Sequence, residues 1–164
     1  MGEVNASKLP KRILDGKRKY VNFQVDMAVE LVQIPGVTNH HQIVWQIRAL
    51  QINGRNLVVG PLAEWQRKSS GDFKKIMKVL SIIGQVDRIR DEKKVKKSTN
   101  PKHDGVYEIR ADKGSARLMF FYCEKTQSAV ICTHTYWKTK ASKKEQDQAF
   151  ENCNTLKQIY EQQR

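Results

Sequence analysis

The sequence predicts an α+β fold that is organised around an antiparallel meander. Residues 105–140, GVYEIRADKGSARLMFFYCEKTQSAVICTHTYWKTK, have the pattern of three strands joined by tight turns. The aromatic and β-branched residues of this stretch fit a pleated, half-buried surface. Apolar residues recur at helical spacing in two segments before the stretch and in one after it. A block of strands with helices before and after it is typical of the α+β class.

The strongly basic composition indicates a polyanionic partner. The chain has 164 residues, and its 30 Lys and Arg against 17 Asp and Glu give a formal net charge of +13. Nucleic acid is the usual polyanion for such a protein. The alternative is a basic protein without a specific partner. The length is sufficient for one domain with a hydrophobic core and an appendage.

Neither a membrane segment nor a disulfide framework is indicated. No apolar run is long enough to span a bilayer, and residues 1–19 lack the apolar core of a signal peptide. The three cysteines form an odd set without a CxxC pair, and the four histidines are scattered. We therefore expect a cytoplasmic protein with reduced thiols and without a metal site, cofactor, membrane contact or small-molecule ligand.

The N-terminal part of the chain is the least informative. Residues 1–20 are basic and nearly free of core residues, which predicts a flexible arm. Residues 21–34 place valines on one helical face and predict a short helix, with a strand as the alternative because valine is frequent. Pro35 and Gly36 end this element in either case.

A strand and a helical hairpin follow. Residues 43–51 alternate apolar and polar side chains with a period of two, which predicts a strand that ends before Asn53 and Gly54. Residues 61–68 predict a helix, as do residues 72–85, where Asp72 is the N-cap candidate. Because about three residues join the two helices, we expect them to form an antiparallel hairpin.

The C-terminal half predicts a basic loop, the meander and a last helix. Residues 86–104 are rich in Lys and Arg and predict a mobile loop that contacts a phosphate backbone or is simply solvated. The meander strands are expected at 106–111, 116–124 and 127–135. An amphipathic helix is expected over 143–162, where Ser142 and Glu145 have the spacing of a capping box.

This order of elements resembles the RelE superfamily of bacterial toxins, most closely its HigB-like, phage-associated branch. The resembling stretches are WQIRALQINGRNLVVGPLAEW, DFKKIMKVL, DGVYEIR, RLMFFY and THTYWKTK, which lie within residues 42–162. The most specific feature is the GVYEIR strand, followed by a second strand with an arginine and a third with a histidine. The resemblance divides the chain into a basic, partly flexible N-terminal extension over 1–41 and a RelE-like toxin domain over 42–164.

The resemblance implies a fold and an activity. The fold is α+β, with a small, curved, mostly antiparallel sheet packed on the helical hairpin, and a C-terminal helix. Active members are ribosome-dependent endoribonucleases that cut mRNA without a metal and are silenced by an antitoxin. The expected function is therefore that of the toxin of a type II toxin–antitoxin system, with mRNA on the ribosome and a cognate antitoxin as partners. The alternative is a non-catalytic nucleic-acid-binding protein or a gyrase inhibitor of the ParE-like branch.

Five residues near the strand ends are the catalytic candidates. Cleavage by the ribose 2′-OH requires a base, cations that hold the phosphoryl oxygens, and an acid for the leaving 5′-oxygen. The candidates are Arg110, Arg117, His134, Tyr136 and Lys138. The two arginines are expected to clamp the phosphate, because a guanidinium donates two parallel hydrogen bonds. Their alternative role is a surface ion pair with Glu108 or Asp112.

The third strand and the residues after it are expected to supply the acid–base groups. His134 suits proton transfer at neutral pH, and nearby positive charge would favour its neutral form. Its alternative is a hydrogen-bonded structural histidine. Tyr136 and Lys138 share a face with His134 in an extended chain, where Tyr136 would stack on a base or relay a proton and Lys138 would stabilise developing charge. For Trp137 we expect a packing role.

Further basic residues are candidates for RNA binding. They are Lys93, Lys94, Lys96, Lys97, Lys102, His103 and Lys140. For Lys102 and His103 the resemblance implies a loop that approaches RNA, and the alternative for both is a solvated loop. We assign no role to His40 and His41.

Overall fold

A seven-stranded mixed sheet forms the centre of the structure. The structure is a computed structural model, and it describes residues 27–39, 44–125, 128–139 and 143–163. The strand order of the sheet is β1-β2-β7-β6-β5-β4, and β3 pairs with β2 beside this path. The strands are β1 (Val29–Val32), β2 (Gln46–Ile52), β3 (Arg55–Asn56), β4 (Val95–Lys97), β5 (Val106–Arg110), β6 (Ala116–Cys123) and β7 (Ala129–Trp137). Only the β2–β7 pair is parallel among these strands, so the expected α+β class with a mostly antiparallel sheet is confirmed.

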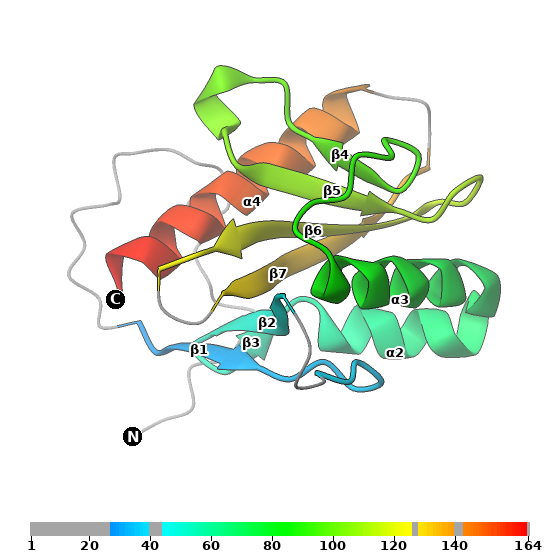
Figure 1. Cartoon of the computed structure of the whole chain (residues 1–164), viewed down its shortest axis with the longest axis horizontal. Helices are drawn as coiled ribbons and strands as arrows, with labels where there is room; N and C mark the ends of the chain where they lie inside the picture. The colour runs from blue at the N-terminus through cyan, green and yellow to red at the C-terminus, as the bar shows by residue number, and fades with distance from the viewer. Residues whose placement is uncertain (1–26, 40–43, 126–127, 140–142, 164) are drawn as a thin grey trace.

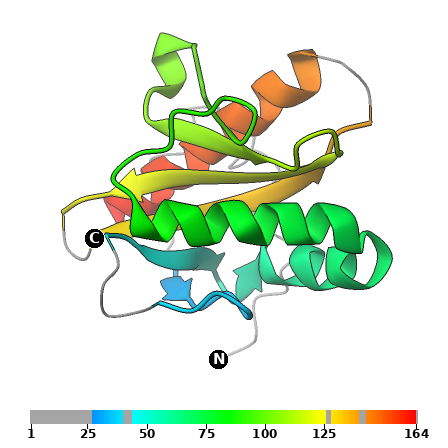
Figure 2. The same ribbon diagram turned by 45° about the vertical axis from the view of Figure 1, so that its right-hand side comes forward.

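Helices cover both faces of the sheet (Figures 1 and 2). The hairpin of α2 (Val59–Lys68) and α3 (Ser70–Gln85) packs on one face, and α4 (Lys143–Gln162) crosses the other. A short 3₁₀ helix, η3 (Pro101–His103), follows β4. Strand β6 alternates between the two layers, because Leu118 and Phe120 join the core under the hairpin whereas Met119 and Phe121 join the core under α4. Successive residues of β6 therefore face the hairpin and α4 in turn, and a bulge between Met119 and Phe120 shifts this alternation in β7.

The hairpin has the expected order, but Asp72 does not cap α3. The helix begins at Ser70, and its N-cap residue Ser69 makes no side-chain capping bond. The carboxylate of Asp72 instead accepts hydrogen bonds from the backbone N–H groups of Ser115 (2.8 Å) and Ala116 (2.9 Å). Asp72 therefore fastens the turn between β5 and β6 to the helical hairpin.

The prediction of a short helix over 21–34 is wrong for residues 27–34, the part of this segment that the structure describes. Val29–Val32 form β1, which pairs antiparallel with β2 from Val29↔Ile52 to Val32↔Ala49, and Ile34 beyond it is buried in the core. The alternative of a strand is correct, because β-branched side chains favour an extended backbone. The sheet thus begins before residue 42, within the segment expected to be an extension. The arm expected over 1–20 lies outside the described residues.

The basic segment over 86–104 is more ordered than expected. Val95–Lys97 form the edge strand β4, in which Val95 is buried and pairs with Ile109 of β5. A single buried valine between two pairs of lysines is a weak sequence signal, and it fixes the segment to the sheet. The last helix agrees with expectation, although Ser142 of the proposed capping box is not among the described residues. In the described part of the chain, no helix is long and apolar enough to cross a membrane.

Candidate functional site

Three polar candidates lie directly opposite one another across the meander. Arg110 of β5 pairs with Arg117 of β6, which pairs with Tyr136 of β7. In the neighbouring row, Glu108 pairs with Met119, which pairs with His134. The structure therefore brings four of the five catalytic candidates together at one end of three adjacent strands, on the part of the sheet that α4 covers.

A carboxylate that was expected from the sequence only as an ion-pair partner is the centre of this cluster. Glu108 has no exposed surface. Its Oε2 accepts a hydrogen bond from the hydroxyl of Tyr136 (2.5 Å), and its Oε1 accepts one from Nε2 of Gln146 on α4 (3.1 Å). The same Oε1 lies 3.3 Å from Nε of Arg110 and 3.6 Å from Nε of Arg117. Such pairing is what an ionised carboxylate requires when it is removed from water.

The sequence does contain a signal for Glu108. In the strand VYEIR, Val106 belongs to the core under α4 and the next residue but one is Glu108, whereas Tyr107 and Ile109 pack on the opposite core. The period-two pattern thus places Glu108 on an inward face. A charged residue at an inward position requires a partner, and the nearby arginines are the evident ones.

The two arginines differ in their surroundings. The side chain of Arg117 is 7% exposed, and its NH1 donates to the backbone carbonyls of Gly114 and Ala116. The side chain of Arg110 is 26% exposed and donates to the carbonyl of Glu92. The alternative of an ion pair with Glu108 is thus realised, although the carboxylate is buried and not on the surface. Arg110 has the greater access to a ligand.

His134 is buried at the edge of the cluster. Burial lowers the pKa of its imidazole to about 4, so the ring is neutral at pH 7. The cause is burial, and not the nearby positive charge that the sequence had suggested. Nδ1 lies 3.0 Å from the hydroxyl of Thr133, and within the described residues the buried Nε2 has no hydrogen-bond partner.

Tyr136 and Lys138 extend the cluster towards the end of β7. Burial and the hydrogen bond to Glu108 raise the pKa of the Tyr136 hydroxyl well above its usual value, so the phenol keeps its proton at neutral pH. Lys138 lies one residue beyond the strand, where its backbone N–H donates to the carbonyl of Ser115. This bond holds the backbone of Lys138 beside the start of β6, the strand that carries Arg117.

The first turn of α4 covers the cluster. Besides the contact between Gln146 and Glu108, Nζ of Lys96 donates to Oε1 of Gln146 (3.2 Å). Glu145 accepts hydrogen bonds from the backbone N–H and the hydroxyl of Thr139, which ties the residues after β7 to the same turn. The first turn of α4 therefore covers Glu108, whereas Arg110 keeps 26% of its side chain exposed.

The expected RNA-binding residues are spread over a larger surface. Lys96 and His103 line a groove of about 640 Å³ between the β4–η3 segment and the start of α4, which contributes Lys143 and Lys144. Lys97 pairs with Asp104 at 3.1 Å, and Lys94 lies 4.0 Å from Asp91. Lys93 and Lys102 are exposed, and Lys140 is outside the described residues. Lys96 is linked to the cluster by a hydrogen bond to Gln146 of α4, which in turn bonds to Glu108.

The cluster combines groups that can hold a phosphate with groups that can move a proton. It has two guanidiniums, a protonated phenol, a carboxylate and a neutral imidazole. Among the residues that the structure describes, no group of three His, Cys, Asp or Glu side chains could hold a metal ion. Comparison with models of protein families, with characterised proteins and with solved structures finds no match to this chain.

Proposed function

We propose that this chain is a metal-free endoribonuclease of the RelE-like, HigB-like kind, the toxin of a type II toxin–antitoxin system acting on mRNA at the ribosome. The proposal rests on one observation above all: Arg110, Arg117 and Tyr136 are aligned across β5, β6 and β7, beside Glu108 and His134. The net charge of +13 adds the long-range attraction that an RNA substrate requires. The order of elements in the sequence supplies the resemblance to the family.

In the proposed reaction, the ribose 2′-oxygen forms a bond to phosphorus while the bond from phosphorus to the 5′-oxygen breaks. Arg110 and Arg117 hold the phosphoryl oxygens. Glu108 or the neutral imidazole of His134 accepts the 2′-OH proton, and the protonated phenol of Tyr136 gives a proton to the leaving oxygen. The products are a 2′,3′-cyclic phosphate and a 5′-hydroxyl. Lys138 stabilises the charge that develops.

If Glu108 is the base, the reaction requires Gln146 to release it. In the structure the carboxylate is enclosed by Gln146, Tyr136 and the arginines, and it has no exposed surface. Displacement of the first turn of α4 would expose Glu108 and the phosphate-binding side of Arg110. We propose that binding to the ribosome causes this opening.

The proposal is tested with purified protein, ribosome-bound mRNA and an excess of a metal chelator. We expect cuts that persist in the chelator and leave 5′-hydroxyl ends. Arg110→Ala should lower the cleavage rate by roughly 10²–10³, the typical effect of losing one group that stabilises transition-state charge. Arg67→Ala, an exposed arginine on α2, is the matched control and should cleave normally. Intact mRNA, or equal cleavage by both variants, would contradict the proposal.

A non-catalytic function is the alternative, as a nucleic-acid-binding protein or a gyrase inhibitor. The observation that favours it is that both arginines are already engaged by Glu108 beneath α4. Such a protein would use its basic surface and leave RNA uncut. Intact RNA together with DNA damage after induction would support this alternative.

An antitoxin partner follows from the same proposal. A small protein with acidic groups would bind the basic surface around β4 and the start of α4 and keep the site inactive. The test is co-expression of the neighbouring reading frame, followed by pull-down. Failure of any neighbour to bind, combined with harmless expression of this chain alone, would contradict the toxin proposal.

A further inference from the structure

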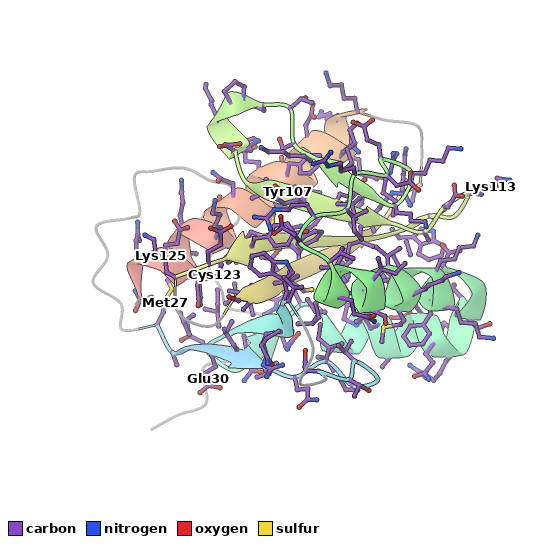
Figure 3. All side chains as sticks on the ribbon, viewed as in Figure 1. Met27, Glu30, Tyr107, Lys113, Cys123 and Lys125 are labelled. Carbon is purple, nitrogen blue, oxygen red and sulfur yellow. The ribbon has the colours of Figure 1, made fainter. Side chains whose placement is uncertain are left out.

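Strand β4 presents lysines to both faces of the sheet, at the edge beyond Tyr107 of β5 (Figure 3). Val95 packs in the core under the hairpin, so Lys97, two residues later in the strand, lies on that same face. Lys96 lies on the other face, directly opposite Glu108 in the register. The alternation within β4 therefore places Lys96, and not Lys97, on the face that carries the cluster and is covered by α4.

Lys96 carries an ammonium group that no carboxylate of the described residues pairs with. Its Nζ donates a hydrogen bond of 3.2 Å to the amide oxygen of Gln146, which is uncharged. Lys97 differs, because its Nζ lies 3.1 Å from a carboxylate oxygen of Asp104. An ammonium group has three protons to donate, so two protons of Lys96 remain for a ligand. Lys96 is thus partly buried, charged and available to an anion.

The groove of about 640 Å³ between the β4–η3 segment and the start of α4 has an uneven distribution of charge. Lys96 shares one end of it with Lys143 and Lys144, which are exposed on the first turn of α4, the turn that covers the cluster. The acidic side chains that line the groove, Asp147 and Glu151, follow about one and two turns later along the helix. An anion is therefore favoured at the lysine end, beside the cluster.

Lys96 and Arg110 are close enough for one strand of RNA to contact both. Lys96 lies opposite Glu108, and Arg110 is two residues from Glu108 on the same face of β5. With about 3.3 Å per residue and about 4.8 Å between neighbouring strands, the backbone positions of Lys96 and Arg110 lie roughly 8 Å apart. When one phosphate lies on Arg110, the phosphate of the next nucleotide or the one after it is therefore within reach of Lys96.

From this arrangement we propose that the lysine end of the groove is a second phosphate subsite, where Lys96, Lys143 and Lys144 hold a phosphate of the RNA strand close to the one on Arg110. An ammonium group binds phosphate as a point charge, without the fixed geometry of a guanidinium, so it tolerates small shifts of the strand. The subsite adds affinity and directs the strand away from the cluster along β4. The inference rests on the proposed function for the identity of the ligand as RNA.

The test measures binding of a short 2′-O-methyl oligouridylate, which cannot be cut because its 2′-oxygen is blocked, at several salt concentrations. Loss of one phosphate contact should make the slope of log K against log salt shallower by about 0.7 for a single strand. Lys96→Gln, which can still donate a hydrogen bond to Gln146, should show this decrease, whereas Lys96→Arg should keep the wild-type slope. Lys97→Gln, at the neighbouring position on the other face, is the matched control and should also keep it.

A variant of α4 and a competitor keep the test decisive. Lys143→Gln combined with Lys144→Gln should make the slope shallower by about 0.7 or more. No binding by wild type, or equal slopes for Lys96→Gln and Lys97→Gln, would overturn the subsite. Binding of polyglutamate that depends on Lys96, with an unchanged slope for the oligouridylate, would overturn it too and assign the groove to an acidic protein. Intact mRNA together with the expected slopes would instead overturn the nuclease and leave the phosphate subsite standing.

Discussion

Gln146, on the first turn of α4, donates a hydrogen bond of 3.1 Å to the buried carboxylate of Glu108 on β5. The amide oxygen of Gln146 in turn accepts a hydrogen bond from Lys96 of β4. One side chain thus connects the edge strand, the central carboxylate and the helix that covers the site. Displacement of the first turn of α4 would therefore break both hydrogen bonds and uncover Glu108.

Gln146→Ala should loosen the start of α4 and increase access to the site. Loss of one hydrogen bond to a charged group costs roughly 1.5–3 kcal/mol, so the helix start should open more often. We expect faster amide hydrogen exchange over residues 143–150 and a higher rate of RNA cleavage. Gln148→Ala is the control, because Gln148 bonds to Asn152, an exposed contact within the same helix. Unchanged exchange and cleavage in Gln146→Ala would show that this contact does not close the site.

Alanine substitution of the two arginines should have different effects on the stability of the fold. Arg117→Ala removes a buried guanidinium that partners Glu108 and two backbone carbonyls, and should lower the free energy of unfolding by about 3–5 kcal/mol. Arg110→Ala removes a partly exposed group, leaves Arg117 beside the carboxylate, and should cost about 1 kcal/mol. Urea denaturation measures both. An equal loss of stability in both variants would mean that Arg117 has no special structural role.

This difference shows what the sequence could predict of the site. The strand pattern of GVYEIR and RLMFFY was enough to place Arg110 and Arg117 side by side, because the register of a short hairpin follows from its turn. It could not show that Glu108 would be enclosed, since that depends on where α4 crosses the sheet. Because Arg117 is buried and Arg110 is partly exposed, only Arg110→Ala tests activity in an intact fold.

The other differences from expectation have the same origin in tertiary packing. Val29–Val32 fit a helix or a strand by composition, and pairing with β2 decides for the strand. Val95 is one apolar residue in a basic segment, and only its contact with the core reveals β4. Asp72 has the spacing of a cap, but two N–H groups from a turn distant in the sequence are its actual partners.

His134 should make stability fall with decreasing pH. Its pKa is about 4 in the folded chain and near 6.5 when unfolded, so the unfolded chain binds more protons between these values. The contribution is complete above pH 6.5 and is lost as pH falls towards 4, by about 2 kcal/mol between pH 7.5 and 5. Urea denaturation at the two pH values should show a correspondingly smaller drop for His134→Gln than for wild type. His103→Gln, at a partly exposed position of η3, should retain the wild-type drop, and identical curves for all three proteins would refute the burial argument.

Substitutions at Gly114 and Asp72 should have strongly non-additive effects on the free energy of unfolding. A Cβ atom on Gly114 would lie 2.5 Å from Oδ1 of Asp72, which is too close for any real contact. Gly114→Ala should therefore lower the free energy of unfolding by about 1–3 kcal/mol. The cost should largely disappear when Asp72 is already alanine, so the double mutant should be more stable than the sum of the single effects predicts. Gly71→Ala is the control for the loss of glycine flexibility, because a Cβ added there would meet no atom within 4 Å, and simple additivity would contradict the contact.

The most direct test of the central claim is to map RNA 5′-ends in cells after induction of the wild-type chain, Arg110→Ala and Arg67→Ala. The account predicts new 5′-hydroxyl ends at codon spacing within translated messages for wild type and Arg67→Ala. For Arg110→Ala, which should remain folded, these ends should be absent or reduced by roughly 10²–10³. Intact messages in cells that express the folded wild-type chain, or the same ends with Arg110→Ala, would contradict the claim that this row of residues cleaves RNA.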